Sequence, residues 1–198
     1  MGIHIARYKH ADRIEWGVVE NDSIRPINGD FPTLADFLQR GRDAARGASG
    51  DPIPIDSVAL LSPVTAPCSV VCQGLNYGTH RAESGHAADK PPFNLLFMKA
   101  ASSLSGPTDD IIRPKGVKLL DYELELGLVI GKPLTQRTKI TKDDLGEFVA
   151  GIVITNDVSA RDVQIPQNQW FKGKSFRTFC PTGPYLYLLE PDDIPRLD

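Results

Sequence analysis

The chain has 198 residues, and its 22 Lys and Arg against 25 Asp and Glu give a formal net charge of -3. This balance provides no basic field for nucleic acid phosphates or an anionic membrane, and no apolar run reaches the roughly 18 residues of a membrane helix. The first residues carry charges and histidines where a signal peptide would be apolar. We therefore expect a folded cytoplasmic protein with no nucleic acid or membrane partner.

The cysteines are three in number, Cys68, Cys72 and Cys180. An odd count, with two of the three flanking a strand-like run, favours structural thiols over a disulfide framework. Zinc would need Cys or His ligands at closer spacing, and the four histidines form no such cluster. We expect no zinc centre.

The N-terminal part predicts a small unit made of a hairpin and a helix. Residues 13–27 alternate apolar and polar side chains around an Asn-Asp pair, which indicates two short strands joined by a tight turn. Thr33 then caps a helix whose apolar residues recur at helical spacing until Gly47. The segment 48–57 is rich in Pro, Gly and Ser and is typical of a linker. We place a domain boundary at about residue 60, so that residues 61–198 form the second unit.

The second unit begins with two predicted strands, 68–75 and 93–99, the first of them buried. The polar stretch 76–83 follows the first strand directly, and such strand ends are common places for chemistry. Residues 76–90 are dense in Gly, Ala, His and charged side chains, and we expect them to form a mobile lid.

Residues 121–131, with the sequence DYELELGLVIG, predict a strand whose two faces differ. One face carries Glu123 and Glu125 beside Gly127, a residue that leaves room for another group to approach. We interpret the opposite face as a core stripe, formed by Tyr122, Leu124, Leu126, Leu128 and Ile130.

A helix and a buried strand follow. Thr141 and Asp144 stand at the spacing of a capping box, which predicts a helix over about 142–149. The apolar run 152–154 predicts a strand that ends in Thr-Asn-Asp, so Asp157 lies at the C-terminal end of this strand.

Glu123, Glu125 and Asp157 together have the oxygen ligands that a hard cation prefers. Two Glu at i and i+2 on a strand have side-chain bases about 7 Å apart, and Asp157 would complete a facial set. Oxygen ligands alone suit Mg²⁺ or Mn²⁺. The structural alternative is that Glu123 and Glu125 mark a solvated strand face and that Asp157 is a turn residue.

Two further features could act in catalysis. His80 and Glu83 are three residues apart, so in a helical turn the carboxylate could orient the imidazole and leave one nitrogen free as a base. Lys174 lies between a glycine and a serine, which would permit close approach to an anion. The plainer alternatives are a surface His–Glu pair and a solvated loop lysine.

Five segments, in this order, resemble successive signature blocks of the fumarylacetoacetate hydrolase family. The resemblance covers roughly residues 61–189 and implies an α+β, mainly β fold: a mixed β-sheet roll with few helices, usually assembled as a homodimer. Because the family's domain continues well beyond this point, we expect the roll to be incomplete at its C-terminal end. The segments are SVVCQGLNYGTHRAESG, PPFNLLFMKAASSLSGPTDDIIRP, LLDYELELGLVIGK, GIVITNDVSARDVQ and QWFKGKSFRTFCPTGPYL.

The resemblance also implies roles for individual residues. Glu123, Glu125 and Asp157 match the family's ligands for Mg²⁺ or Mn²⁺, and the region CQGLNY lacks a further aspartate ligand, so a site of three protein ligands is expected. The same matching implies substrate-binding roles for Tyr77, Arg161 and Gln164, and catalytic roles for His80, Glu83 and Lys174.

The function that we expect from the resemblance is metal-dependent hydrolysis of a carbon–carbon bond in a small β-diketo acid, such as an acylpyruvate. His80, oriented by Glu83, would activate water, and Lys174 would stabilise the departing enolate together with the metal. A decarboxylase, isomerase or hydratase of a 2-oxo-dienoate would use the same parts. An inactive fragment or binding module is the alternative of a different class, and metal-dependent turnover would distinguish it from an enzyme.

Overall fold

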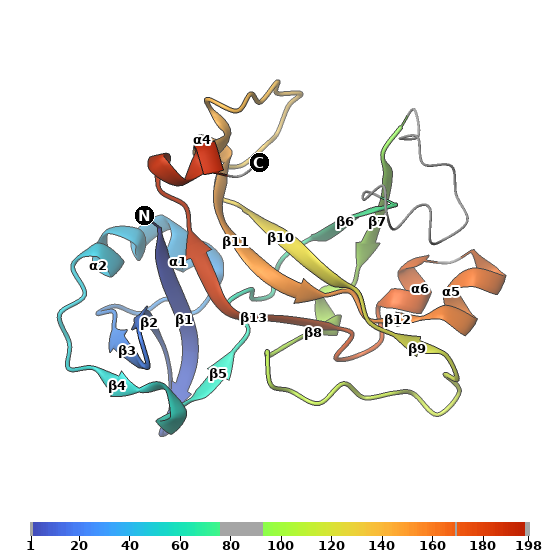
Figure 1. Cartoon of the computed structure of the whole chain (residues 1–198), viewed down its shortest axis with the longest axis horizontal. Coiled ribbons are helices and arrows are strands. Elements are labelled where there is room, and N and C mark those ends of the chain that lie inside the picture. The colour runs from blue at the N-terminus through green and yellow to red at the C-terminus, as the bar shows by residue number, and fades with distance from the viewer. Residues whose placement is uncertain (1, 76–92, 169, 197–198) are drawn as a thin grey trace.

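The computed structural model describes residues 2–75, 93–168 and 170–196, and its fold is mainly β (Figure 1). Within these ranges the largest sheet has nine strands, seven of them in the order β10-β11-β13-β1-β2-β3-β4. Strand β5 pairs with β1, and β8 pairs with β13. The bounds are β1 (Ile3–His10), β2 (Arg13–Glu20), β3 (Ser23–Pro26), β4 (Ile53–Pro54), β5 (Ala59–Leu61), β8 (Leu104–Ser105), β10 (Leu124–Ile130), β11 (Val149–Asn156) and β13 (Cys180–Leu188).

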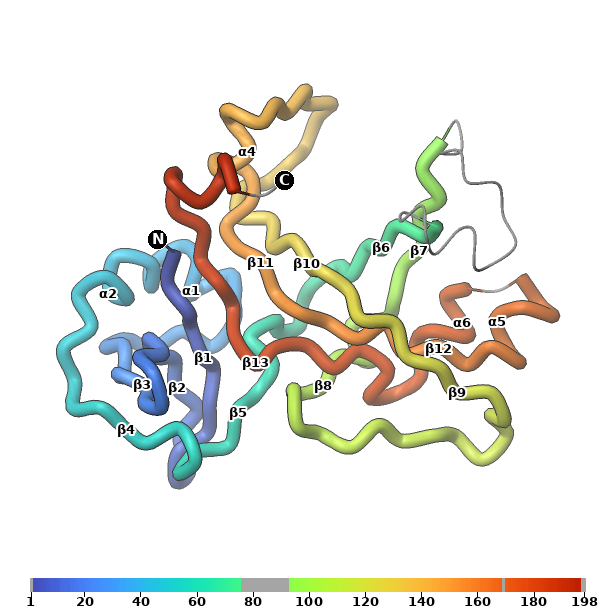
Figure 2. Tube along the Cα trace, in the orientation of Figure 1, coloured from blue at the N-terminus to red at the C-terminus, as the bar shows by residue number. Residues whose placement is uncertain are grey.

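The long strands β10, β11 and β13 run side by side through the middle of the molecule (Figure 2). The N-terminal strands lie on one side of them. On the other side lie two smaller antiparallel pairs, β6 with β7 and β9 with β12, together with two short helices. The bounds are β6 (Val70–Gly74), β7 (Leu95–Lys99), β9 (Leu120–Asp121), β12 (Ser159–Ala160), α5 (Arg161–Gln167) and α6 (Trp170–Lys174).

The predicted hairpin is confirmed as β2 and β3, whereas the sequence interpretation missed β1. Strand β1 pairs with β2 on one side and with β13 and β5 on the other, so it lies inside the sheet. Its consecutive residues Ile5 and Ala6 are both fully buried. Because both faces are covered, the strand lacks the simple alternation by which a half-buried strand is recognised.

The predicted helix after Thr33 is confirmed, but it consists of two pieces, α1 (Leu34–Arg40) and α2 (Arg42–Arg46). Thr33 Oγ1 accepts from the backbone N–H of Asp36, and the Asp36 carboxylate accepts from the backbone N–H of Thr33, which forms a capping box. The helix breaks at Gly41, where a Cβ atom would lie 2.4 Å from the Phe37 ring. A side chain at position 41 would clash with this ring, so glycine is required where the two helices meet.

Phe37 is the centre of the largest apolar core. Its ring is fully buried, stacks on Trp16 with the centroids 4.7 Å apart, and meets Phe31 edge-on at 5.7 Å. The Trp16 indole N–H donates to the backbone oxygen of Phe31 at 2.8 Å, so its one polar group is satisfied. Side chains from β11 and β13 complete this core, which therefore joins the N-terminal helices to the long strands.

The predicted linker 48–57 is partly structured. It contains β4, which pairs with β3 and extends the large sheet, and a 3-10 turn at Ile55–Ser57. Because β1 pairs with β13, this sheet includes strands from both sides of residue 60. The boundary placed there stays a prediction.

The two strands predicted around residue 70 and residue 95 are confirmed as β6 and β7, but the first is not buried as expected. Val71 on β6 and Leu96 on β7 are 60% and 61% exposed. A 3-10 turn follows β7 at Ala101–Ser103. The expected lid, 76–90, lies outside the described residues.

Strand β10 turns the opposite face to the core from the one we expected. The predicted core stripe is exposed, with Leu124 at 73% and Leu128 at 56%, whereas Val129 on the carboxylate face is buried. The room that Gly127 leaves is used by Val153, because a Cβ at Gly127 would lie 2.8 Å from a Val153 methyl carbon. Alternation shows which residues share a face, but the neighbouring strands and helices decide which face is packed.

The region before β11 was predicted in outline only. Thr141 does donate to the Asp144 carboxylate, but Asp144 is itself the N-cap, so helix α4 (Leu145–Phe148) is shorter than the predicted 142–149. The apolar strand expected at 152–154 is confirmed as the longer β11, and β13 is followed by a 3-10 helix at Pro191–Arg196. Across the described ranges, no helix is both long enough and apolar enough to span a membrane.

Replacing Phe37 with Ala should destabilise the protein by about 3–5 kcal/mol, because a buried aromatic side chain is removed and a cavity remains. Phe171→Ala is the matched control: this ring is 53% exposed, and its loss should change stability by less than about 0.5 kcal/mol. Urea unfolding followed by tryptophan fluorescence measures both. Equal losses in the two variants would contradict the assignment of Phe37 to the core.

Candidate active site

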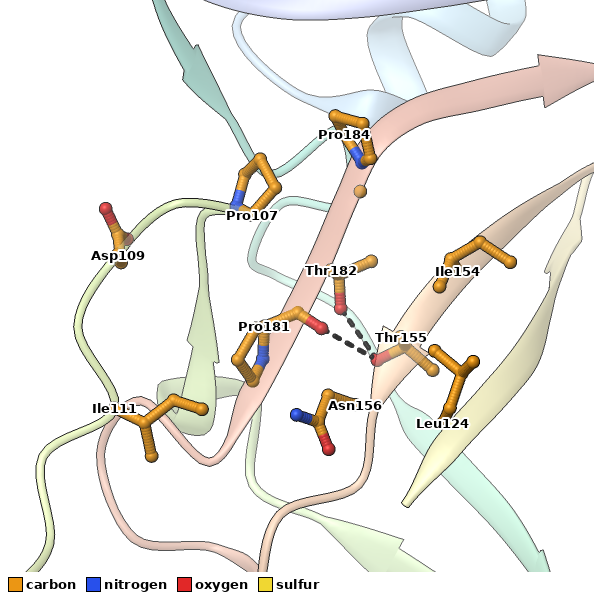
Figure 3. A pocket seen from close by; sticks show the side chains of 11 residues that line it. Pro107, Asp109, Ile111, Leu124, Ile154, Thr155, Asn156, Pro181, Thr182 and Pro184 are labelled. Carbon is orange, nitrogen blue, oxygen red and sulfur yellow. Dashed lines mark hydrogen bonds between the residues drawn. The ribbon is translucent and has the colours of Figure 1, made fainter. Parts of the chain in front are cut away.

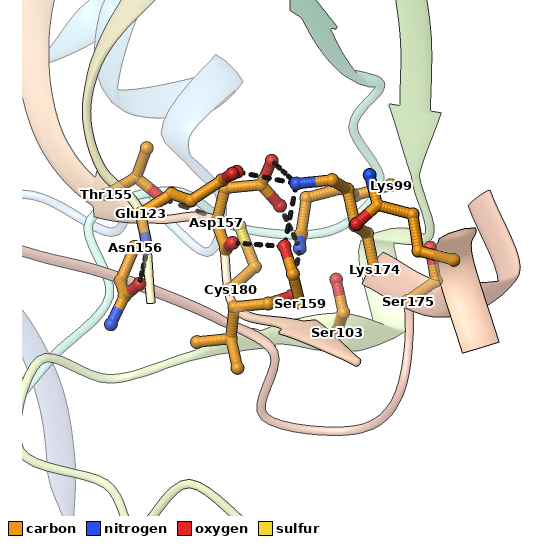
Figure 4. Close-up of polar contacts among 12 residues, drawn as sticks. Lys99, Ser103, Glu123, Thr155, Asn156, Asp157, Ser159, Lys174, Ser175 and Cys180 are labelled. Carbon is orange, nitrogen blue, oxygen red and sulfur yellow. Dashed lines mark hydrogen bonds and ion pairs between the residues drawn. The ribbon is translucent and has the colours of Figure 1, made fainter. Parts of the chain in front are cut away.

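The centre of the candidate site is Asp157, whose carboxylate is bound by two lysines. The Lys99 ammonium lies 2.6 Å from Oδ1, and the Lys174 ammonium lies 2.7 Å from Oδ2 (Figure 4). All three residues are at most 5% exposed. Buried charges are tolerated when they are paired and hydrogen-bonded, and each oxygen of Asp157 has its own cationic partner.

Lys174 also joins Asp157 to a second carboxylate. Its ammonium donates to Glu123 Oε2 at 2.6 Å and to Ser159 Oγ at 2.7 Å. The other oxygen of Glu123 accepts from the Arg161 guanidinium, again at 2.6 Å. Two carboxylates from the ends of neighbouring strands therefore converge on one positively charged atom (Figure 4).

Arg161 extends the network toward the surface. Its guanidinium also donates to Asp121 Oδ2 at 2.8 Å and to Gln164 Oε1 at 2.9 Å. Because Arg161 begins α5, the start of this helix is tied to the segment before β10.

The pairing of β10 with β11 brings the two carboxylates together. Glu123 directly precedes β10 and Asp157 directly follows β11, and the antiparallel register places Leu124 opposite Asn156. The Asp157 N–H donates to the Glu123 backbone oxygen at 2.8 Å, and the Glu123 N–H donates to Asn156 Oδ1. The two residues thus form one more rung at the end of the ladder.

The two lysines come from β7 and α6, which are tied to each other. Lys99 is the last residue of β7 and Lys174 the last of α6, and the Ala100 N–H donates to Ser175 Oγ at 2.9 Å. Gly173 lets α6 approach α5 closely, since a Cβ there would lie 2.7 Å from Gln164. The glycine beside Lys174 therefore serves helix packing rather than the approach of an anion.

The charges around Glu123 keep its carboxyl group ionised. Burial raises the pKa of Glu123, but the hydrogen bonds and positive charges of Lys174 and then Arg161 outweigh this effect and bring the pKa to about 2. Burial alone lowers the pKa of Arg161, yet Glu123 and Asp121 raise it above its ordinary value. At neutral pH, Glu123 and Arg161 are both charged.

The sequence matches the family model described as "Fumarylacetoacetate (FAA) hydrolase C-terminal" over residues 69–198, and residues 3–63 match a model described as "Rv2993c-like, N-terminal". The chain belongs to the fumarylacetoacetate hydrolase family. This confirms the resemblance seen in the five sequence segments.

Relatives and solved structures in this family carry different activity names. "Oxaloacetate tautomerase Fahd2a, mitochondrial" from Rattus norvegicus is 42% identical over 178 residues, which cover 86% of this chain and 54% of the relative. The fumarylacetoacetate hydrolase structure from Exiguobacterium antarcticum has 33% identity and a TM-score of 0.74, over 96% of this chain and 67% of that one. A probable 2-hydroxyhepta-2,4-diene-1,7-dioate isomerase from Mycobacterium abscessus has 34% identity and a TM-score of 0.74, over 97% and 66%. The chain spans about half the length of the curated relatives that it matches.

Two of the three expected ligands, Glu123 and Asp157, are placed to hold the divalent metal of the family. Glu123 Oε2 and Asp157 Oδ2 both lie within 2.7 Å of one ammonium nitrogen, which stands where two carboxylates would share a cation. Glu125 is half-buried on the same strand face as Glu123. In the described part of the chain, no three His, Cys, Asp or Glu side chains are arranged to hold a metal. The set of three ligands stays a prediction.

The other predicted site residues fall into two groups. Lys174, Arg161 and Gln164 all belong to the network around Glu123. Tyr77, His80 and Glu83 lie outside the described residues, so their roles stay predictions.

Sequence reasoning missed Lys99, Asp121 and Ser159 as members of this network. Lys99 had a signal that could have revealed it, because it is the single charged residue at the end of the apolar run LLFM. A lysine in that position needs a buried anionic partner, and Asp157 provides it.

A pocket of about 250 Å³ lies beside the ends of β10, β11 and β13 (Figure 3). Among the residues that line it only Asp109 ionises, and its carboxylate accepts from the Gly106 N–H. Thr155 and Thr182, also in its wall, hydrogen-bond to each other. The pocket thus lacks the charges that the Asp157 site has. Its lining residues are Pro107, Asp109, Ile111, Leu124, Ile154, Thr155, Asn156, Pro181, Thr182, Gly183 and Pro184.

The low pKa of Glu123 predicts a specific loss of stability in acid. Because folding lowers this pKa from 4.5 to about 2, the ionised Glu123 stabilises the fold above pH 4.5, and this contribution disappears as the pH falls toward 2. Glu123→Gln should remove that part of the pH dependence, worth up to a few kcal/mol, since one pKa unit corresponds to about 1.4 kcal/mol. Urea midpoints measured from pH 7 to pH 2.5 test this.

Glu147→Gln is the control, because the Glu147 side chain is 65% exposed and pairs only weakly with Lys132. This variant should follow the wild-type pH profile. An unchanged acid profile in Glu123→Gln would show that the carboxylate is not held ionised by Lys174 and Arg161.

Proposed function

We propose that the protein catalyses the keto–enol tautomerisation of a small dicarboxylic 2-oxo acid of the oxaloacetate class, assisted by Mg²⁺ or Mn²⁺. The observation that carries this proposal is the convergence of Glu123 and Asp157 on the buried ammonium of Lys174, with Arg161 beside them. The names of the tautomerase and isomerase relatives support it.

The reaction needs fixed positive charge next to an oxygen atom. In tautomerisation a proton leaves the carbon beside a carbonyl group, and the carbonyl oxygen becomes negative until it gains a proton in turn. Preorganised charges stabilise that oxygen best where water is excluded. Lys174 is 2% exposed, and its ammonium also donates to Ser159, which is not one of the proposed metal ligands, so its charge is shielded from water and held in place.

The remaining roles follow from the chemistry of the residues. Arg161 and Gln164 lie side by side and can bind a substrate carboxylate, for which the planar guanidinium is well suited. We assign the proton transfer to His80, oriented by Glu83, because imidazole exchanges protons near neutral pH. A divalent ion held by Glu123, Asp157 and Glu125 would act as a Lewis acid toward the substrate's oxygens.

Hydrolytic cleavage of a β-diketo acid, the function expected first from the sequence, is the second candidate. It uses the same positive charges to stabilise an enolate but also needs a water molecule activated for attack on the distal carbonyl. The Exiguobacterium structure named fumarylacetoacetate hydrolase supports it. We rank it second because the tautomerase relative is more similar in sequence, at 42% identity against 33%.

The decisive assay offers the chain enol-oxaloacetate and acylpyruvates, with and without Mg²⁺ or Mn²⁺, and follows enol absorbance and pyruvate release. We expect metal-dependent tautomerisation without cleavage. Asp157→Asn should lower kcat by about 100-fold or more, as loss of a group that organises electrostatic stabilisation does. Asp143→Asn, at an exposed residue, is the matched control and should retain full activity.

Three outcomes would change the proposal. Cleavage of acylpyruvates without faster tautomerisation would reverse the ranking of the two reactions. Turnover of a 2-oxo-dienoate alone would favour the isomerase, decarboxylase or hydratase. Mn²⁺ binding without turnover of any substrate would favour a binding module.

Proton transfer and metal binding should be separable by mutation. His80→Ala should lower kcat by about 10²–10⁴-fold, the usual value of general-base assistance, with Mn²⁺ affinity unchanged. Glu125→Ala should instead weaken Mn²⁺ binding, because it removes one of three charged ligands. His86→Ala is the control within the same segment. Full activity of His80→Ala, or its loss of Mn²⁺ binding, would contradict the assignment.

A further inference from the structure

The two buried lysines occupy different places relative to the carboxylates. The Lys174 ammonium contacts Glu123 Oε2 and Asp157 Oδ2, and so it lies between two of the three carboxylates that the proposed function gives to the metal. The Lys99 ammonium contacts the opposite oxygen of Asp157, Oδ1, at 2.6 Å and the backbone oxygen of Val158 at 3.3 Å. Lys99 and Lys174 therefore contact different oxygens of Asp157, and of the two only Lys174 also contacts Glu123.

We propose that Lys174 is an internal counter-ion that holds the metal's position in the metal-free protein and withdraws from the two carboxylates when a divalent cation binds. The inference rests on the proposed function in one respect, that Glu123 and Asp157 are metal ligands. The inference goes beyond the proposed function because it gives Lys174 one set of partners without metal and another set with metal.

The geometry leaves no room for both cations. A hard cation binds carboxylate oxygens at about 2.0–2.6 Å, and the ammonium already lies 2.6 and 2.7 Å from the same two oxygens. A metal ion there would take the place of the ammonium and repel it. A lysine suits such an exchange, because its charge is carried on a flexible four-carbon stem.

Two neighbours of Lys174 remain suitable partners after the exchange. Ser159 Oγ, 2.7 Å away, can still accept a hydrogen bond, and the face of the Phe97 ring lies 5.2 Å from the ammonium. In contrast, we expect Lys99 to stay in place, because its acceptors among the described residues are Asp157 Oδ1 and the Val158 backbone oxygen, neither of which is an oxygen that the metal would share with Glu123. It keeps Asp157 oriented with Oδ2 toward the site.

The inference makes a prediction about Mn²⁺ affinity that does not depend on activity. Lys174→Met removes the competitor, so isothermal titration should show Mn²⁺ binding at least tenfold tighter than in wild type. Removing any buried positive charge favours a cation to some extent, and Lys99→Met measures this general effect because Lys99 is equally buried. The gain in Lys174→Met should exceed the gain in Lys99→Met by about tenfold, whereas Lys172→Met, at an exposed lysine on the same helix, should equal wild type.

Thermal unfolding after chelation of metal gives a second readout. Metal-free Lys174→Met should melt at a lower temperature than metal-free wild type, because Glu123 and Asp157 repel each other without the ammonium. Mn²⁺ should raise the melting temperature more in the variant than in wild type. If Lys174→Met does not fold, Lys174→Gln replaces it in both the Mn²⁺ titration and the thermal unfolding, because glutamine keeps a hydrogen-bond donor but has no charge.

The outcomes separate this inference from the proposed function. Equal gains in Lys99→Met and Lys174→Met, or no gain in Lys174→Met, would overturn the counter-ion role, while Mn²⁺ binding by wild type would leave the metal site intact. If neither wild type nor any variant binds Mn²⁺, both the counter-ion role and the proposed metal site are wrong. Tighter Mn²⁺ binding confined to the Lys174 variants would establish the exchange.

Discussion

The contact on which the site depends is the bond of each Asp157 oxygen to its own ammonium group. If the buried carboxylate had one cationic partner, its second oxygen would lack a charged donor. A buried lysine without a carboxylate would be even less stable, because its charge would be unpaired. Lys99 and Lys174 come from segments 75 residues apart, and Asp157 from a third. Their ion pairs therefore tie together β7, α6 and the end of β11 in the metal-free protein.

The large sheet makes this arrangement possible. Strands β10 and β11 end together, so that Glu123 and Asp157 form a final rung, and β13 connects them to β1 and the N-terminal core. The aromatic cluster around Phe37 lies far along this sheet from the charges, yet it packs against residues of β11 and β13. Packing at one end of these strands thus supports the geometry of the carboxylates at the other.

The same set of charges suits several reactions of the family. Tautomerisation, isomerisation and hydrolytic cleavage all pass through an anionic oxygen, which Lys174 and Arg161 can stabilise. What distinguishes the reactions is the group that moves the proton and the way the substrate is held. The residues assigned to proton transfer, His80 and Glu83, lie apart from the charged network in sequence. Under the proposed function, we therefore expect selectivity among substrates to depend on that segment together with Arg161 and Gln164, rather than on the carboxylates.

The sequence alone determined the features that depend on local patterns: the hairpin of β2 and β3, the Thr33 N-cap, strand β11, and most of strand β10, although Glu123 lies one residue before its start. Membership of the family followed from the order of five segments. Only the tertiary structure decided that the Glu123 face of β10 is the inner one, that Gly127 makes room for Val153, and that Lys99 belongs to the site. A period of two tells which side chains share a face, and a cap tells where a helix begins. Which face is covered, and which lysine meets which carboxylate, depends on strands and helices that are distant in the chain and meet only when it folds.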